Sequence, residues 1–396
     1  MESLDSLLQT SLKDGVVPSL ALLAKRRDGS CVLSKYLGGS LPSWPNQCTV
    51  DSQTVFTLAS CTKLPTTVAA LQLVEKQLIS LDTDVSSIIP VLGRQKVLAG
   101  WNPDGSPILN KRRNPITLRH LLTHSSGAGY DFSNTDLEKF HCSRNILTSN
   151  GSAIDERFDL PLLFEPGEGW EYGCGIDWAG KVVQQLSGTS LESYLRQNVW
   201  EPLGATSFTF WPKCQDKEGR HLASLTVKSE TTGRLKELPD GLGLNIGVTD
   251  CFGGQGGYSN AADYTELLFS LLANDKRLLQ AETVDMMFEG QLSKKSKEVL
   301  QAVTKDPSWA IGDFYPGEVY DWGLGGLLIE QLESCDALCA RGPRTLVWSG
   351  AANLFWFIDR KGLCGLFATQ VLPSYDPDIE KLIAAFQEFV YKTGDS

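Results

Sequence analysis

The sequence predicts a mixed α/β (α+β) protein in which strands come from both ends of the chain and helices lie between them. Apolar residues recur at helical spacing in the middle of the chain, whereas strand-like runs cluster at its ends. These runs are 19–24, 31–36, 54–58, 344–348, 354–358 and 363–368. With 396 residues, the chain is long enough for two or more folding units around a sizeable core.

Helices and turns of the first half follow from local patterns. Residues 2–13 are amphipathic and predict a helix, and Asp28 with Gly29 predicts a turn between the first two strands. A helix is expected from Lys63 to about Ile79. The following region, 82–115, is rich in Pro, Gly and Asn, so we expect a long connection into a second lobe.

Capping residues indicate where several later helices begin and end. Thr117 is suited to begin a helix that carries His120 and His124 and ends at Gly127. Residues 176–186 predict a helix closed by Gly188. Thr189 with Glu192 predicts a capping box for the next helix, which runs to about Val199. A glycine-rich loop at 253–257 precedes a helix over 262–273, and a last helix is expected over 376–391.

Composition excludes several functional classes. A formal net charge of -11 disfavours nucleic acid and anionic membranes as partners. The N-terminus lacks the apolar run of a signal peptide, and no segment approaches the ~20 apolar residues of a membrane span, so we expect a cytoplasmic protein. Ten scattered cysteines without a Cys-x-x-Cys pair favour free thiols. The basic run Lys111 to Arg113 fits a solvated loop or, alternatively, a docking patch.

The pair Ser60 and Lys63 is the strongest candidate for chemistry. The two residues lie three apart where a strand gives way to a helix, so their side chains share a face and can touch. A serine hydroxyl becomes a nucleophile when a neighbouring base takes its proton, and a neutral lysine can be that base. The alternative is that Ser60 caps the helix and Lys63 is solvated.

His120 and His124 also have the spacing of zinc ligands on a helix. Position 121 is Leu, where a His-Glu-x-x-His site needs Glu, and no third ligand is evident. We therefore disfavour a metal site.

Further motifs occur in a fixed order along the chain. Ser60-x-x-Lys63 comes first, then the segment His120-Leu-Leu-Thr-His-Ser-Ser-Gly127, then Tyr172 on a loop before a helix. Last comes the strand ending in Trp348, followed by Ser349, Gly350 and Ala351. This order resembles the serine β-lactamase and penicillin-binding protein superfamily in its class C and esterase branch. The residues of these motifs are most similar to those of fungal transesterases of the statin side-chain acyltransferase type.

The resemblance implies a β-lactamase/transpeptidase-like fold of two lobes. A mainly antiparallel sheet flanked by helices would be built from residues 1–85 and 320–396. Residues 86–319 would form an inserted, mainly helical lobe with active-site loops. The active site would lie in the cleft between the lobes.

Roles for individual residues are also implied by the resemblance. Ser60 would be the nucleophile, Lys63 its general base, and Tyr172 a second base that relays protons and activates the acceptor. The N–H groups of Ser60 and Ala351 would form the oxyanion hole. Trp348, Ser349 and Gly350 would contact substrate, and no metal or organic cofactor would be needed.

Two departures from the superfamily pattern restrict the class of substrate that we expect. β-Lactamases and peptidases of this type usually carry Asn two residues after the tyrosine and Lys or His at the position of Trp348. Here those positions are Cys174 and Trp348. The Asn contacts an amide and the cation meets a carboxylate. Their absence disfavours β-lactams and peptides, and an aromatic side chain suits an apolar acyl chain or a fused-ring acceptor.

The expected activity is therefore acyl transfer from a thioester or ester, through an acyl-enzyme on Ser60, to a hydroxyl of a secondary-metabolite-like acceptor. A carboxylesterase or thioesterase would share these steps and use water as the acceptor, so both activities stay open here. A non-catalytic binding module is a third alternative. An acyl carrier domain is a possible donor partner, because Lys111 to Arg113 offers a basic run in an acidic protein.

Overall fold

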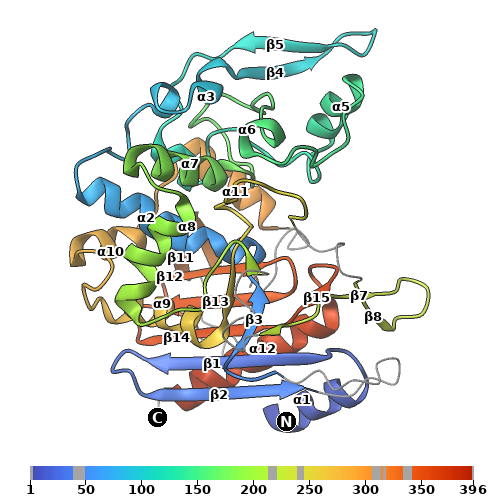
Figure 1. The fold of residues 1–396 in the computed structure, drawn as a ribbon, viewed down its shortest axis with the longest axis vertical. Coiled ribbons are helices and arrows are strands. Elements are labelled where there is room, and N and C mark those ends of the chain that lie inside the picture. The colour runs from blue at the N-terminus through green and yellow to red at the C-terminus, as the bar shows by residue number, and fades with distance from the viewer. Residues whose placement is uncertain are drawn as a thin grey trace.

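A seven-stranded sheet forms the centre of the protein (Figure 1). We describe it from a computed structural model, for residues 3–38, 50–212, 221–238, 245–305, 314, 318–332 and 341–394. Across the sheet the strands are β10 (Glu318–Trp322), β11 (Leu327–Leu332), β12 (Thr345–Gly350), β13 (Leu354–Asp359), β14 (Leu363–Ala368), β1 (Ser19–Arg26) and β2 (Cys31–Gly38). All its pairings are antiparallel. The expected α+β class, with strands from both chain ends in one sheet, is thereby confirmed.

Helices α9 (Ala261–Ala273) and α12 (Pro377–Gly394) cover opposite faces of this sheet. Lys25 on β1 lies opposite Cys364 on β14 and bonds to Glu266 of α9. Gly365, the next residue, lies against Phe386 of α12. Because successive residues of a strand point to opposite faces, the two helices sandwich the sheet. Helix α1 (Leu4–Lys13) packs beside α12 at the edge carrying β2 (Figure 1).

The remaining helices lie mostly in the middle of the chain, as expected. The longer ones are α2 (Lys63–Glu75), α5 (Thr135–Ser143), α7 (Gly175–Ser187), α10 (Ala281–Met287) and α11 (Lys294–Val303). Shorter ones are α3 (Pro90–Arg94), α4 (Leu118–Leu122), α6 (Ile154–Arg157) and α8 (Leu191–Leu195), with single turns at Ala59–Thr62, Val85–Ser87, Arg196–Trp200 and Glu201–Leu203. Helix α7 packs against α2, α4 and α8, so it occupies the centre of the helical region.

Small sheets join segments that are distant in sequence. Strand β3 (Thr54–Thr57) pairs with β6 (His221–Leu222) and β9 (Tyr258–Asn260). Strand β7 (Thr226–Lys228) pairs with β8 (Leu235–Glu237) and β15 (Val371–Leu372). The pairing of β3 with β9 places the glycine-rich loop at 253–257 beside the segment that leads to Ser60.

The region 82–115 is not the plain connection that its composition predicted. It contains α3 and a hairpin of β4 (Lys96–Trp101) and β5 (Pro107–Lys111), with the Pro- and Gly-rich residues forming the tight turn. Trp101 anchors the hairpin to α5, because its Nε1 donates to Asp136 at 2.9 Å and Lys139 lies over its ring. A small separate core of Leu137, Phe140 and Leu160 packs beneath it.

Local capping differs from the sequence predictions at three helices. Helix α4 ends at Leu122, so His124 lies beyond it, with a positive φ of 58°. Ser190, not Thr189, caps α8 by accepting from Ser193 N, and Glu192 instead accepts from Phe210 N. Helix α2 ends at Glu75, before the expected Ile79. In each case a tertiary contact or a neighbouring residue of similar capping strength decides the boundary.

Two broader expectations concern membranes and cysteines. Among the described residues, no helix has both the length and the apolar character needed to cross a membrane. The thiols of Cys31, Cys61, Cys142, Cys174, Cys251 and Cys364 are free. Cys48, Cys214, Cys335 and Cys339 lie outside the described residues.

Packing of α12 on the sheet predicts that a Leu-to-Ala substitution will lower stability much more at a buried position of this helix than at an exposed position elsewhere. Leu382 on α12 is 1% exposed within the main core, whereas Leu78 is 53% exposed. Leu382→Ala should lower the free energy of unfolding by about 2–5 kcal/mol, because it leaves a cavity. Leu78→Ala should change it by less than about 1 kcal/mol. Urea denaturation measures both, and equal losses would contradict this packing.

Candidate active site

The turn that carries Ser60 is held at the junction of β3 and α2. Ala59, the residue before the serine, has a φ of 45°, a conformation that costs free energy for any residue except glycine. Leu58 N donates to Gly257 O at 2.9 Å, which ties this turn to the glycine-rich loop. Ser60 is partly exposed while Ala59 and Cys61 are buried, so the bend presents the hydroxyl to solvent.

Lys63 is the most unusual buried residue of the site. Its side chain is long and charged in water, yet the residue is only 1% exposed. Its Nζ lies 3.3 Å from Ser60 Oγ and donates to Tyr130 OH at 3.2 Å and to Gly254 O at 2.7 Å. A buried amine with three oxygen partners meets the requirement that buried polar groups be hydrogen-bonded. The predicted Ser60–Lys63 contact is therefore present.

Tyr172 lies in the site with its ring against Lys63. The Nζ atom is 4.6 Å from the centroid of the Tyr172 ring. The Tyr172 hydroxyl accepts from Nε1 of Trp348 at 3.2 Å. The role of second base expected for Tyr172 stays a prediction, since the hydroxyl that bonds to Lys63 is that of Tyr130.

Sequence reasoning missed Tyr130 and its partner Asp177. Tyr130 follows the segment 120–127 on a loop, and Asp177 lies in the first turn of α7. The Tyr130 hydroxyl donates to Asp177 Oδ2 at 3.1 Å, and Asp177 Oδ1 accepts from Gly254 N at 2.8 Å. Both residues are almost fully buried. A tyrosine in a loop and an aspartate near a helix start carry no signal by themselves, because both are common at such positions.

Burial shifts the pKa values of these groups. The pKa of Tyr130 lies well above 10, first because the ring is buried and then because Asp177 is close. Burial also raises the pKa of Asp177, against the opposing effect of Lys63. Burial and then Lys63 lower the pKa of His124 well below 6.5. Tyr130 is therefore protonated and His124 neutral around neutral pH.

The two histidines of segment 120–127 serve the backbone. His120 Nδ1 accepts from Thr117 N at 3.3 Å, within the cap of α4. His124 Nδ1 accepts from Gly173 N at 3.2 Å, and its ring lies 4.6 Å from that of Tyr172. These histidines thus support a helix start and the Tyr172 loop.

Strand β12 brings Trp348, Ser349, Gly350 and Ala351 to the site. A Cβ on Gly350 would lie 2.3 Å from Leu58 O, so only glycine lets β12 approach the Ser60 turn this closely. Ala351 follows at the end of the strand, and its carbonyl accepts from Ser374 Oγ. The substrate-binding and oxyanion-hole roles expected for these residues stay predictions.

An aromatic cluster surrounds Tyr172. The ring centroids of Tyr172 and Trp348 are 4.9 Å apart, and those of Trp322 and Trp348 are 4.7 Å apart. Trp348 is 4% exposed. Four further tryptophans are 0–3% exposed and belong to the core, namely Trp170, Trp178, Trp322 and Trp356.

Cys174 occupies the position at which β-lactamases and peptidases of this superfamily usually carry an amide-binding Asn. Its thiol is buried, lies 3.5 Å from Gly129 O and has a pKa raised by burial. Cys174 is therefore part of the packed interior beside the loop of Tyr130.

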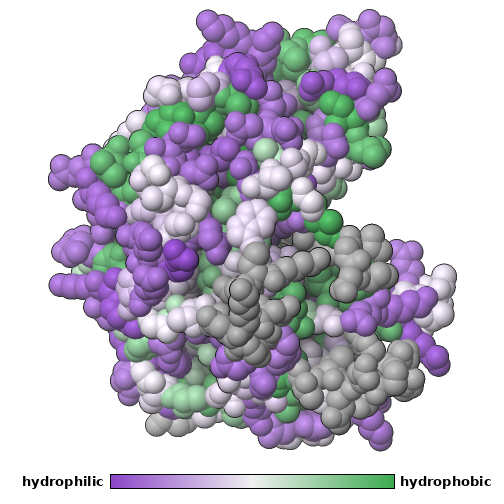
Figure 2. Space-filling view, in the orientation of Figure 1, coloured by the Kyte–Doolittle hydropathy of each residue, from purple (hydrophilic) through white to green (hydrophobic). Residues whose placement is uncertain are grey.

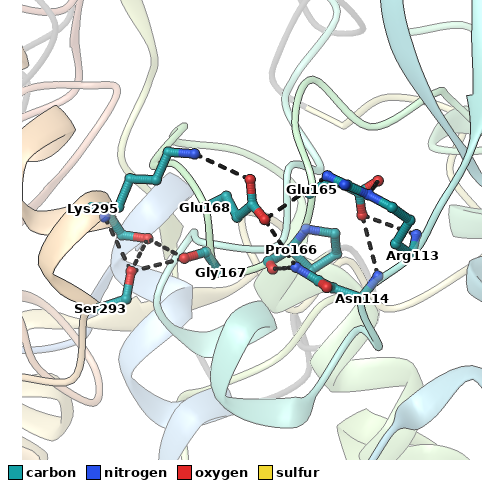
Figure 3. A network of polar contacts seen from close by, with 9 residues as sticks. Arg113, Asn114, Glu165, Pro166, Gly167, Glu168, Ser293 and Lys295 are labelled. Carbon is teal, nitrogen blue, oxygen red and sulfur yellow. Dashed lines mark hydrogen bonds and ion pairs between the residues drawn. The ribbon is translucent and has the colours of Figure 1, made fainter.

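Polar contacts fix the segment that precedes Tyr172 (Figure 3). Glu165 accepts from the backbone N–H groups of Arg113 and Asn114, and Asn114 donates to Pro166 O. On the other side, Ser293 Oγ donates to Gly167 O at 2.8 Å. Glu168 pairs with Lys295. The Tyr172 loop is therefore clamped between the β5–α4 connection and α11.

The molecule is hollowed between its two parts. Figure 2 shows a notch between the upper region, which contains β4, β5 and α5, and the lower region, which contains the large sheet.

Comparison with known proteins agrees with this geometry. A family model described as "Beta-lactamase" matches residues 4–387. The chain belongs to the beta-lactamase family. It is 35% identical to lovastatin esterase from Penicillium rubens, over 98% of both chains. It is 33% identical to monacolin J acid methylbutanoyltransferase from Aspergillus terreus, over 98% of this chain and 95% of that one.

The fold also matches that of a solved structure. A variant of simvastatin synthase from Aspergillus terreus superimposes with a TM-score of 0.87 at 33% identity, covering 99% of this chain and 95% of the other. The family inferred from the sequence motifs is thus confirmed, and the relatives of this chain include one named as an esterase and one named as an acyl (methylbutanoyl) transferase.

The close approach of β12 to the Ser60 turn at Gly350 predicts that one added methyl group will strongly lower activity. Gly350→Ala should lower ester turnover at least 100-fold, because the added Cβ would force β12 away from the Ser60 turn. Gly93→Ala in α3, where the nearest atom would lie at 3.3 Å, is the control and should keep activity within about twofold. Steady-state kinetics on a p-nitrophenyl ester measures both. Equal activity of the two variants would contradict the packing argument.

His124 predicts a pH dependence of stability. Because its pKa in the folded protein lies below the value of ~6.5 for an unfolded chain, only the unfolded state binds this proton as the pH falls below 6.5. The folded state should therefore lose up to ~1.4 kcal/mol per pH unit from this residue. His124→Gln should give a shallower slope of unfolding free energy between pH 7 and 5.5. Urea titrations at several pH values test this, and identical slopes would refute it.

Proposed function

We propose that this protein transfers an acyl group from a thioester or ester, through an acyl-enzyme on Ser60, to a hydroxyl of a secondary-metabolite acceptor. The observation that carries this proposal is the contact of the buried Lys63 amine with Ser60 Oγ at 3.3 Å. That arrangement provides a nucleophile and a base in one site. The acyltransferase homologues and the simvastatin synthase fold support it.

In the first step, Ser60 Oγ attacks the donor carbonyl while its proton moves to Lys63. The N–H groups of Ser60 and Ala351 would stabilise the oxyanion, and one such donor is typically worth ~3 kcal/mol. The leaving thiolate or alkoxide then takes the proton from Lys63. Tyr172 would act as the second base for the incoming hydroxyl, with its orientation fixed by the N–H of Trp348.

The acceptor should be apolar and ring-shaped. Trp348 stands where related peptidases place a cation, and it packs against Tyr172. Trp348, Ser349 and Gly350 would form one wall of the site. We therefore propose an acceptor alcohol with a fused-ring body, of the monacolin type named for two relatives.

Hydrolysis is the second candidate function, because one relative at 35% identity is named lovastatin esterase. The two activities differ in whether water or an alcohol attacks the acyl-enzyme.

A competition experiment separates transfer from hydrolysis. Treatment with a small acyl thioester should give a single acyl adduct by intact mass on wild type and none on Ser60→Ala. Addition of monacolin J acid should then convert most of the adduct to an ester product. Release of free acid alone, at every alcohol concentration, would assign the protein as an esterase. No adduct on folded wild type would favour a non-catalytic binding protein.

An acyl carrier domain is a proposed donor, which would dock on the basic run Lys111 to Arg113. Arg112 donates to Asn114 O and Ser86, and Arg113 pairs with Glu165, so both also serve internal contacts. Lys111 at the end of β5 is exposed. Lys111→Glu should slow reaction with a carrier-bound acyl group several-fold and spare a small thioester. Lys294→Glu, at a residue whose side chain is 93% exposed, is the control. Equal effects of Lys111→Glu on both donors would remove the docking proposal.

A further inference from the structure

Asp177 is a buried carboxylate beside the catalytic pair to which no step above gives a role. It is 0% exposed, and its two oxygens have different partners. Oδ1 accepts from Gly254 N at 2.8 Å and Oδ2 accepts from Tyr130 OH at 3.1 Å. A Cβ on Gly254 would lie 2.3 Å from Oδ2, so the carboxylate is packed directly on this glycine. These contacts fix its orientation.

The partners of Lys63 can be assigned as donors or acceptors. A neutral amine has two N–H bonds and one lone pair. Gly254 O can only accept, so it takes one N–H at 2.7 Å. The Tyr130 hydroxyl gives its single proton to Asp177, so its oxygen accepts the second N–H of Lys63 at 3.2 Å. The lone pair is then left for the remaining neighbour, Ser60 Oγ at 3.3 Å.

We propose that Asp177 is a positioning residue that sets the direction of the Tyr130–Lys63 hydrogen bond and so keeps the Lys63 lone pair directed at Ser60. This inference rests on the proposed serine acyl transfer. It assigns Tyr130 a supporting role, as an acceptor toward Lys63, and it explains why a carboxylate is buried behind the site. The high pKa of Tyr130 agrees with a hydroxyl that keeps its proton.

The proton balance of the acylation step follows. The Oγ–H bond of Ser60 breaks as the bond from Oγ to the donor carbonyl carbon forms, and the proton enters the Lys63 lone pair. Lys63 then has three N–H bonds, directed to Gly254 O, Tyr130 OH and the Ser60 oxygen. When the carbon–sulfur or carbon–oxygen bond of the donor breaks, this proton goes to the leaving group. Asp177 and Tyr130 exchange no proton.

Asp177→Asn inverts the hydrogen bond without changing the shape of the side chain. The amide oxygen keeps the bond from Gly254 N, so the amide NH₂ faces Tyr130 and donates to its oxygen. Tyr130 must then direct its own proton elsewhere, and the Lys63 nitrogen is within reach. A lone pair engaged by Tyr130 cannot accept the Ser60 proton. The acylation rate constant should fall at least about 100-fold, the low end of a lost general base, with substrate binding unchanged.

Tyr130→Phe gives the decisive comparison. Phenylalanine cannot donate to Lys63, so the single variant should lose only about tenfold in acylation rate. The double variant Asp177→Asn/Tyr130→Phe should react faster than Asp177→Asn alone, at a rate near that of Tyr130→Phe. A purely structural role for Asp177 would instead make the double variant slower than either single variant.

Asp359→Asn is the control for the general effect of replacing a buried carboxylate with an amide. Asp359 is also 0% exposed, accepts from Tyr391 OH at 2.9 Å and from Gly342 N at 3.0 Å, and lies on β13 at the end opposite to the Gly350 pairing. Asp359→Asn should leave the acylation rate within about threefold of wild type. Pre-steady-state burst kinetics with p-nitrophenyl butyrate gives the acylation rate, and thermal unfolding checks that each variant is folded.

The outcomes separate this inference from the proposed function. If wild type gives no burst and no Ser60 adduct, the proposed function fails. If wild type reacts and Asp177→Asn stays within threefold of it, or the double variant is the slowest, only the role of Asp177 is overturned. If Asp177→Asn does not fold, Tyr130→Phe alone decides. A loss near tenfold supports the inference, and a loss beyond 1,000-fold would make Tyr130 itself catalytic and overturn it.

Discussion

The structure depends on the burial of one amine. Lys63 is 1% exposed, and an amine at that depth is tolerated only where oxygen atoms surround it. Those oxygens come from three separate places in the chain, which are the Ser60 turn, the loop of Tyr130 and the glycine-rich loop at Gly254. Each segment must therefore reach its place before the site is complete. The requirement of the amine for partners links the helical region to the start of α2.

Glycines allow this convergence, because the backbone itself approaches the site. Gly254 lets Asp177 contact the glycine-rich loop, and Gly350 lets the end of β12 contact the Ser60 turn. A Cβ on Gly173 would lie 2.1 Å from Ala128 O, so this glycine lets the Tyr172 loop lie against the loop of Tyr130. Backbone contacts of this kind are rigid. They suit a site in which a shift of about 1 Å in a reacting group can cost 100-fold in rate.

The same contacts bear on specificity. The thiol of Cys174 is turned into the protein, and Trp348 packs on Tyr172 and Trp322. These two positions therefore carry neither the amide nor the cation that peptidases of this type use, and aromatic side chains surround Tyr172.

Sequence alone determined the features that depend on residues close together in the chain. The strands of the large sheet at 19–24, 354–358 and 363–368, the helix that begins at Lys63, and the contact of Ser60 with Lys63 follow from spacing within a few residues. The order of motifs was sufficient to predict the family. Strands β10 and β11, the hairpin β4–β5 and the end of α4 before His124 were not predicted, because their apolar patterns are short and tertiary packing sets their limits.

Only the tertiary structure decided which groups surround the Lys63 amine. Tyr130, Asp177 and Gly254 lie 67, 114 and 191 residues beyond Lys63, as the differences in their numbers give, and no local pattern marks them. A hydrogen bond depends on the distance between two atoms to within a few tenths of an ångström. Such a distance between remote segments is set by the packing of the whole core. The sequence therefore determined the contact of Ser60 with Lys63, and the fold determined the groups that surround this pair.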